Sequence, residues 1–451
     1  MRTATIVSAW ITATLVWGCS GGSKESGDLI HKDGGEPPAD TSNPATSIFK
    51  IFEVPECGLA GYQTVATAGA GKVAFATLAD AGKQAPCAIE SRPQATARVY
   101  DVCLVLPSAN GFVGSIVTSQ PYEAMMGVGL ALDKTGEPVL AYTGGATAAL
   151  RCGASDMLIA SASGGKLGAP QTIAAGSAST GMPADQQANC AAQNVCNQGD
   201  ATGYYPAIAL DPVSGNLGVA FRDLHFGFAD TDFNSSDVEF ALGPAYSVYT
   251  VDVARGGGTY NRLAFSPTGM AAVVHYVDSK PTIWLDWQTA AGWKSQKLFS
   301  NKIGEQLGFA ISSQGLYALA YFDSTRQTLA YRESADGTTW TIAEDVDRDG
   351  VTGNFPSLAF DGQGNPAISY YRCNDYGASS GCSTEKDGLY WARRLNGVWV
   401  TRKIVGESGI SDGTYTALAF VDGKAVIAFQ TATYDPVAAT SKVGLSIAKE
   451  M

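Results

Sequence analysis

The chain has 451 residues, of which 45% are hydrophobic and 16% are charged, and it contains 52 glycines. These proportions are typical of a turn-rich globular protein and exclude a disordered chain or one built mainly of membrane-spanning segments. The formal net charge of −12 argues against a nucleic-acid partner, because an acidic surface repels phosphate backbones.

The N-terminus reads as an export signal. Arg2 precedes an apolar run at 4–17, which has the length of a signal-peptide core and is too short to span a bilayer. The run ends in the sequence VWGC, which resembles the lipobox of bacterial lipoproteins, where a small residue precedes the cysteine that becomes lipidated. We expect a signal peptide over 1–18 and lipidation at Cys19. An ordinary secretory signal and an uncleaved anchor are the alternatives.

Residues 20–46 are rich in Gly, Ser, Pro and Asp and carry almost no apolar side chains, so they cannot bury enough surface to fold. We therefore expect a lipidated cysteine and flexible tether over 19–46 and a folded body over 47–451. A lipid-anchored chain of this kind is expected at the outer membrane or cell surface. A periplasmic or secreted location is the alternative.

The body repeats one pattern of β-strands. A first strand recurs as GYYPAIAL (203–210), GTYNRLAF (258–265), GNFPSLAF (353–360) and GTYTALAF (413–420). A short turn such as DGQGN or DKTGE follows, in which Gly, Asn and Asp supply turn geometry, and then a second apolar strand. Third and fourth strands complete each unit. Seven such units predict an all-β fold, a seven-bladed β-propeller, with six blades as the alternative because the first unit is irregular.

The last unit lacks a strand. It contains TYTALAF, KAVIAFQ and KVGLSIAK, and then the sequence ends. The stretch SIFKIFEV at 47–54 stands before the first unit and has the character of the missing strand. Pairing it with the last unit would leave no exposed sheet edge, so we expect the N-terminal strand to close the ring.

One turn carries a family resemblance. The sequence SADGTTW at 334–340 is similar to the Asp-box of BNR-like repeats, and with the strand repeat it resembles bacterial sialidase-like propellers. The turn is one residue shorter than the family's box between Asp336 and Gly337. In that family the box is a structural turn on the face away from the active site, so the resemblance implies fold rather than catalysis.

Propeller topology places the long connections on one face. The stretches 79–97, 174–202, 222–237 and 372–388 are long and polar, and such loops on a rigid scaffold are where ligands usually bind. The aromatic residues at the starts of the inner strands are also consistent with packing between blades. The candidate residues of this ligand face are Tyr205, Arg222, Asp223, Tyr260, Arg262, Phe355, Arg372 and Tyr415.

Catalytic chemistry is harder to find. Sialidase chemistry needs an arginine cluster with a Tyr–Glu pair, and Arg348 could join the three ligand-face arginines, but no family arginine motif is recognisable. The GxSxG match at 409–413 precedes a strand rather than the helix that a nucleophile elbow requires. His275 lies in an apolar strand and is expected to be a core residue. We therefore assign no catalytic residue and favour a non-enzymatic protein.

The cysteine count predicts disulfides. Setting Cys19 aside leaves eight of nine cysteines, an even number in an exported chain. Close spacing predicts the pairs Cys190–Cys196 and Cys373–Cys382. Four others allow three pairings, which the sequence leaves open: Cys57, Cys87, Cys103 and Cys152.

One loop has the spacing of a calcium site. Asp345, Asp347 and Asp349 alternate in the sequence DVDRDG, where carboxylates at this spacing can point to one centre. The loop is similar to calcium loops of EF-hands, although Pro356 stands where the twelfth-position acid would be. We expect calcium here, with a solvated acidic turn as the alternative.

These observations predict a lipid-anchored propeller at the cell envelope that binds or scaffolds a glycan or protein without catalysis. The alternative is a glycan hydrolase of sialidase-like fold.

Overall fold

The computed structural model describes residues 48–86, 96–120, 127–144, 155–176, 201–224, 236–252, 257–277, 280–301, 303, 306–373, 376–377, 381–382, 387–406, 410–435 and 440–451. The predicted signal peptide, Cys19 and the whole of the predicted tether lie outside this part of the chain. Across the same residues, no helix is long and apolar enough to cross a membrane.

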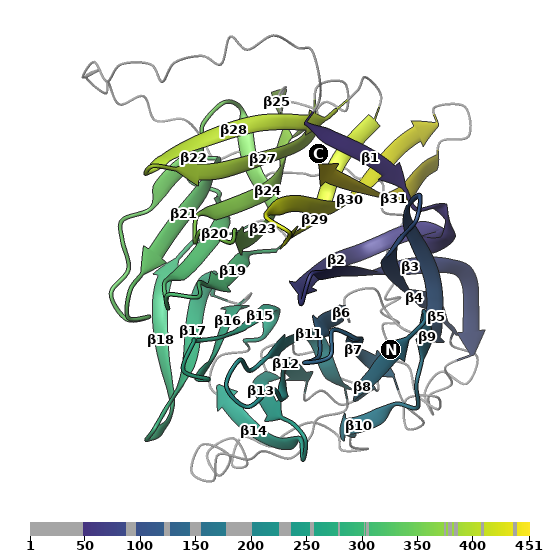
Figure 1. The fold of residues 1–451 in the computed structure, drawn as a ribbon, viewed down its shortest axis with the longest axis vertical. Coiled ribbons are helices and arrows are strands. Elements are labelled where there is room, and N and C mark those ends of the chain that lie inside the picture. Colours follow the sequence, from purple (N-terminus) through teal and green to yellow (C-terminus); the bar gives the residue numbers. More distant parts are fainter. Residues whose placement is uncertain are drawn as a thin grey trace, which may run out of the picture.

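Seven antiparallel sheets form a ring (Figure 1), which confirms the seven-bladed propeller and shows the six-bladed alternative to be wrong. From the innermost strand outward, the first three blades are β2 (Leu59–Gly69), β3 (Lys72–Pro86), β4 (Thr96–Ser108) and β5 (Gly111–Gln120); β6 (Val128–Leu132), β7 (Pro138–Gly144), β8 (Asp156–Ser163) and β10 (Gln171–Ala174), with β9 (Lys166–Leu167) also on β8; and β11 (Ala201–Leu210), β12 (Leu217–Leu224), β13 (Ser236–Leu242) and β14 (Ser247–Asp252).

The remaining blades follow in the same order. They are β15 (Thr259–Phe265), β16 (Ala271–Val277), β17 (Thr282–Thr289) and β18 (Gly292–Ser300); β19 (Gly308–Ile311), β20 (Tyr317–Asp323), β21 (Thr328–Ser334) and β22 (Glu344–Asp347); β23 (Val351–Phe360), β24 (Pro366–Cys373), β27 (Gly388–Leu395) and β28 (Val398–Val405); and β29 (Ile410–Val421), β30 (Lys424–Asp435), β31 (Thr440–Glu450) and β1 (Phe49–Glu53). A small hairpin, β25 (Tyr376–Gly377) and β26 (Gly381–Cys382), precedes β27.

The cores of the protein lie between neighbouring blades. Leu104 of β4, for example, packs in one cluster with Leu130 of β6 and Leu140 of β7. Because both faces of a blade are covered, the second strands β7, β12 and β16 are buried along their whole length. This double burial explains why these strands read as continuous apolar runs rather than as alternating ones.

Side-chain oxygens fix the turns that join the first and second strands. Asp361 Oδ1 accepts hydrogen bonds from the backbone N–H groups of Gln363 and Asn365, both at 2.8 Å, and Gly364 supplies a φ of +83°. This local bonding is why short turns with Asp or Ser followed by Gly mark the repeat. Equivalent bonds form at Asp133, Asp211, Ser266 and Ser312.

The Asp-box-like sequence forms a turn between β21 and β22. Asp336 Oδ1 accepts from the N–H groups of Thr338 and Thr339, both at 2.7 Å, and these bonds hold the pKa of its carboxyl well below the usual range. Trp340 Nε1 donates to the carbonyl of Gly337 at 3.0 Å. The turn therefore has the structural role that the resemblance implies.

The N-terminal strand closes the ring as predicted. Phe49 to Glu53 pair antiparallel with Glu450 to Ser446, which makes β1 the outer strand of the last blade. A disulfide between Cys57 and Cys103 then ties the chain to β4 in the first blade. The closing strand is thus fixed on one side to the last blade and on the other to the first.

Two predicted loops are partly strand. In 79–97, β3 continues to Pro86 and β4 begins at Thr96, with Gln84 paired to Arg98. In 372–388, the short hairpin β25–β26 interrupts the loop. In both cases backbone pairing continues past the point where the apolar pattern ends.

Candidate functional site

Every blade has a residue with left-handed backbone near the start of its innermost strand, and four blades also have a left-handed glycine two residues before it: Gly203, Gly258, Gly353 and Gly413. The seven residues are equivalent, because the residue two positions after each of them pairs with the corresponding residue of the second strand in its own blade. Their φ angles lie between +48° and +107°. We call these seven residues the collar: Gln63, Gly127, Tyr205, Tyr260, Gln306, Phe355 and Tyr415. The innermost strands contact one another in sequence around the ring, so the collar encircles one end of the central channel.

The aromatic collar residues form two pairs across seams between blades. The rings of Tyr205 and Tyr260 meet edge-on with centroids 5.3 Å apart, and those of Phe355 and Tyr415 lie 4.4 Å apart. Phe355 is buried, whereas the three tyrosines are partly exposed. These aromatic residues therefore pack the blades together, and the tyrosines also present surface to solvent.

Sequence analysis identified the four aromatic members and missed the others. Gln63 reaches the next blade, where its Oε1 accepts from the N–H of Val128 at 3.2 Å. Gln306 has Pro356 at the equivalent place in its next blade, and proline has no N–H to donate. Gln306 is buried, and neither carboxamide atom has a hydrogen-bond partner among the described residues.

The collar backbone is unfavourable for most side chains. A non-glycine residue in the left-handed region costs about 1–2 kcal/mol, which Gly127 avoids. In five blades the ladder register shifts around the collar residue, so the left-handed conformation coincides with a bulge there. Strained backbone that carries large side chains is a reason to look for function at those side chains.

A buried network holds the chain just before Tyr260. Arg222 donates from Nη1 to Thr259 Oγ1 at 2.6 Å and from Nε to Ser236 Oγ at 3.0 Å. Ser236 in turn donates to the carbonyl of Gly257 at 3.0 Å. Arg222, predicted for the ligand face, is 2% exposed, so it acts on the collar by positioning this segment.

His275 holds the same segment from the other side. Its Nδ1 accepts from the N–H of Gly258 at 3.1 Å, and its Nε2 lies 2.9 Å from Asp286 and 3.4 Å from Asp252. Burial lowers the pKa of His275, but Asp286 and Asp252 outweigh it and raise this pKa to about 9, while burial raises the pKa of Asp286.

These three side chains have a donor set that could hold a metal ion. An N–H group can only point at a lone pair, so the bond from Gly258 requires that Nδ1 of His275 carry no proton. Nε2 must then bear the proton of the ring and has no lone pair for a metal. We therefore interpret the cluster as a buried proton-holding group between the third and fourth blades, in which the ring keeps one proton at Nε2 and the extra proton lies on the carboxylates of Asp286 and Asp252, consistent with the raised pKa of Asp286.

The other predicted ligand-face charges have separate partners. The guanidinium of Arg372 forms ion pairs with Asp347 and Asp349 and lies over the ring of Tyr390, 4.7 Å from its centroid. Asp223 is fully buried. The arginines predicted for the ligand face thus lie on different blades and bond to different groups.

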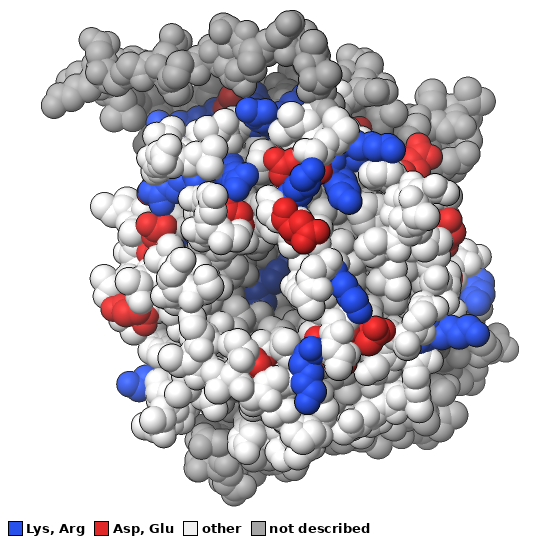
Figure 2. Space-filling view, viewed as in Figure 1, with Lys and Arg blue, Asp and Glu red and all other residues white. Residues whose placement is uncertain are grey.

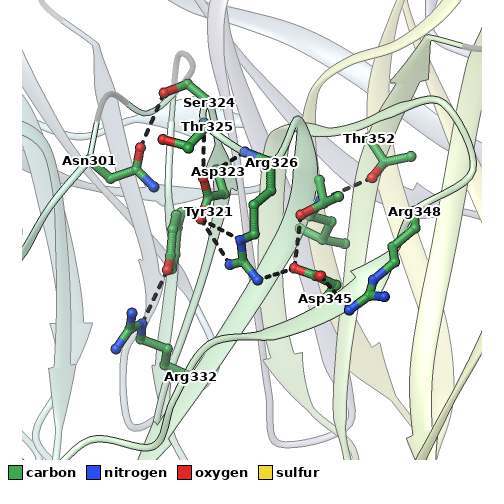
Figure 3. Close-up of polar contacts among 12 residues, drawn as sticks. Asn301, Tyr321, Asp323, Ser324, Thr325, Arg326, Arg332, Asp345, Arg348 and Thr352 are labelled. Atoms are coloured by element: carbon green, nitrogen blue, oxygen red, sulfur yellow. Dashed lines mark hydrogen bonds and ion pairs between the residues drawn. The ribbon is translucent and has the colours of Figure 1, made fainter. Parts of the chain in front are cut away.

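Arginines also engage the first acid of the predicted calcium loop (Figure 3). Arg326 bridges Asp323 and Asp345, and Arg348 Nη2 lies 2.7 Å from the second oxygen of Asp345. Both oxygens of Asp345 therefore already face a positive charge.

The other two acids of that loop pair with Arg372. Asp347 accepts a hydrogen bond from the hydroxyl of Tyr370 at 2.6 Å and lies 3.5 Å from Arg372, which also pairs with Asp349. A calcium ion would have to displace these partners. Calcium at Asp345, Asp347 and Asp349 stays a prediction.

The structure decides one disulfide that the sequence left open. Cys57 pairs with Cys103. Cys373 is also disulfide-bonded, and Cys382 lies on β26, so their pairing stays a prediction. Four of the predicted or open positions lie outside the described residues, as does the lipidation site Cys19: Cys87, Cys152, Cys190 and Cys196.

No protein-family model matches the chain, and no curated protein matches its sequence. Solved structures with a similar fold include the Hadza microbial sialidase Hz136 (12% identity, 78% of this chain and 73% of that one, TM-score 0.46). They also include the NanB sialidase of Streptococcus pneumoniae (12% identity, 92% and 73%, TM-score 0.45) and the Aleuria aurantia lectin, described with α-methyl-L-fucoside (10% identity, 78% and 98%, TM-score 0.42). Similarities this distant concern the fold alone.

Proposed function

We propose that the chain is a non-enzymatic binding or scaffold module for a glycan or protein, and that the collar is its ligand face. The observation that carries the proposal is the set of partly exposed tyrosines Tyr205, Tyr260 and Tyr415 on left-handed backbone. Aromatic rings with a polar edge are suited to binding ligands that have both apolar and hydroxyl surface. A collar of this kind can present them without any loop having to move.

The arginines favour binding over hydrolysis. Sialidase-like catalysis needs several arginines that bind one carboxylate of the substrate. Here Arg222 donates a hydrogen bond to Thr259. Arg372 forms ion pairs with Asp347 and Asp349. Breaking a buried charge-assisted bond to reach a ligand would cost several kcal/mol. We therefore treat hydrolysis as the outcome that would contradict the proposal.

The test uses the chain without its lipid anchor on a glycan array, followed by titration of the best glycan. Tyr205→Gly and Tyr260→Gly remove a ring and also relieve the left-handed backbone, so they should fold as well as the wild type. Each should weaken binding about tenfold, which corresponds to about 1.4 kcal/mol. Tyr249→Ala is the control, because Tyr249 is a 46% exposed tyrosine on the outer strand β14.

If the glycine variants bind as tightly as the control, the collar is not the ligand face. If the wild type releases the fluorophore from an aryl sialoside at an enzymatic rate, the module is a hydrolase and the proposal is wrong.

We also propose that Cys19 anchors the protein at the outer membrane or cell surface, on the basis of the lipobox-like sequence. Cys19→Ser should move the protein from the membrane fraction to the soluble fraction, since the acyl chains provide the attachment. Equal recovery of wild type and variant in the membrane fraction would overturn the lipid anchor.

A further inference from the structure

The wall of the central channel carries one positive charge. Of the residues on the seven innermost strands, Arg262 of β15 is the one Lys or Arg. Figure 2 shows a hollow at the centre of the ring with a basic side chain at its floor. Arg262 lies on β15, one of the innermost strands that line the channel.

Arg262 occupies a position that elsewhere holds small or uncharged residues. The strand registers align it with Val65, Gly129, Ala207, Gly308, Ser357 and Ala417 in the other blades.

This position faces the next blade at close range. A Cβ atom added at Gly308 would come within 2.8 Å of Leu358, and Ser357 Oγ accepts from the N–H of Leu418 at 2.9 Å. A long side chain has little room in such a seam. The guanidinium of Arg262 instead folds back along its own strand, where Nη1 donates to the carbonyl of Asn261 at 3.0 Å. The channel is therefore the space that its remaining donors can face.

The charge of Arg262 is not neutralised by the described part of the protein. No described carboxylate forms an ion pair with it, and the guanidinium has four more N–H donors besides the one on Nη1 that is used. Burial lowers its pKa to about 10, which leaves it charged at neutral pH. A charge that is largely removed from water and lacks a counter-ion is costly, so the site favours an anion.

Two buried neutral amides of the fourth and fifth blades also lack partners among the described residues. Asn261 is fully buried and Gln306, in the collar of the next blade, is 2% exposed. Neither carboxamide has a hydrogen-bond partner among the described residues, for its nitrogen or for its oxygen. Buried amides of this kind normally bond to water or to a bound group.

We propose that the central channel binds a small anion at Arg262, either a free inorganic oxyanion or the carboxylate of an organic acid. A guanidinium matches both because its paired N–H donors fit two oxygens of a planar or tetrahedral acid group. The site lies on the channel wall, two residues beyond Tyr260 on β15, and the proposal does not rest on what the collar binds.

The test is thermal unfolding of the chain at fixed ionic strength in sodium chloride, sulfate, phosphate, acetate or glucuronate. Wild type should gain at least 2 °C in a saturable manner with at least one of these anions over chloride, and Arg262→Gln should lose that gain. Arg402→Gln is the matched control, because Arg402 is exposed on the outer strand β28 and should respond as wild type does. Sulfate and phosphate also stabilise proteins in general because they are excluded from the protein surface. Arg262→Gln and Arg402→Gln should both keep this general stabilisation, so the difference between them reports binding at Arg262.

The anions distinguish the two sources. A gain with sulfate and phosphate indicates a free oxyanion, and a gain confined to acetate or glucuronate indicates the acid group of an organic ligand; both support the site. The proposal is overturned if no anion gives a saturable gain, or if Arg262→Gln keeps the gain. Should Arg262→Gln fail to fold, wild-type crystals soaked in selenate or bromoacetate give the decision, since the absence of anomalous density beside Arg262 for both would overturn the proposal.

Discussion

Replacing Phe49 by alanine tests whether the short N-terminal strand closes the ring. Phe49 is 5% exposed on β1 and contacts Trp391 of the neighbouring blade edge-on, with ring centroids 5.6 Å apart. It shares a core cluster with Ile427 and Ala448 of the last blade. Phe49 therefore joins β1, the last blade and the sixth blade in one packed cluster.

The magnitude follows from these contacts. Loss of the buried ring should cost about 2–3 kcal/mol of transfer free energy, and loss of the aromatic pair about 1 kcal/mol more. Some relaxation is expected because β1 is an outer strand, so we expect the free energy of unfolding to fall by about 3 kcal/mol, within the range seen for buried Phe→Ala changes.

The assay is urea unfolding followed by tryptophan fluorescence, with wild type, Phe49→Ala and Lys50→Ala compared at one pH and salt concentration. Lys50 is the control because it is exposed on the same strand, where its ammonium lies 4.9 Å from the ring centroid of Phe52. Its loss should cost less than about 1 kcal/mol. If Phe49→Ala and Lys50→Ala unfold within about 0.5 kcal/mol of each other, β1 does not close the ring in solution.

Three further predictions concern the disulfide, the buried histidine and the calcium loop. The disulfide joins residues 46 apart, so the Cys57→Ser/Cys103→Ser variant should lose up to about 4 kcal/mol by the loop-entropy relation, and urea unfolding of variant and wild type, both without reductant, checks this; equal stability would contradict it. For His275 and the carboxylates that share its proton, the folded pKa of about 9 lies above the unfolded histidine value near 6.5, so the stabilisation from this proton is complete below pH 6.5 and is lost as the pH rises through 9. Wild type should therefore lose more stability than His275→Gln between pH 6 and pH 9.5, and parallel pH profiles would contradict the proton-holding cluster. Calcium should raise the melting temperature of wild type by about 1 °C over chelator and leave Asp347→Ala unchanged, whereas identical wild-type melting in both would remove the site.

The repeat and the blade count could be predicted from the sequence because the turns and apolar strands of each blade recur as short sequence patterns. The ring closure could be inferred from the strand that the last unit lacks. The turns are local: Asp361 or Ser312 bonds to N–H groups two to four residues ahead, so the residue types and their spacing are enough to identify them. The missing strand could be inferred because an unpaired sheet edge is unfavourable and one unassigned apolar stretch remained.

The candidate site was decided by the tertiary structure. The collar members Gln63, Gly127 and Gln306 share no residue type with the tyrosines, and only the strand registers show that they are equivalent. The arginines illustrate the same limit, because what a charged side chain does depends on which neighbour lies within about 4 Å. Arg222 meets Thr259, 37 residues away, across a seam between blades, a contact that no local pattern records.

The calcium-like spacing shows what a local pattern leaves open. Alternate acids at Asp345, Asp347 and Asp349 are close in sequence, but strands of the fifth and sixth blades bring Arg326 and Arg372 against them. Sequence spacing sets which groups can meet one another within a loop. The packing of blades determines which charges from elsewhere reach them first, and that depends on long-range strand pairing.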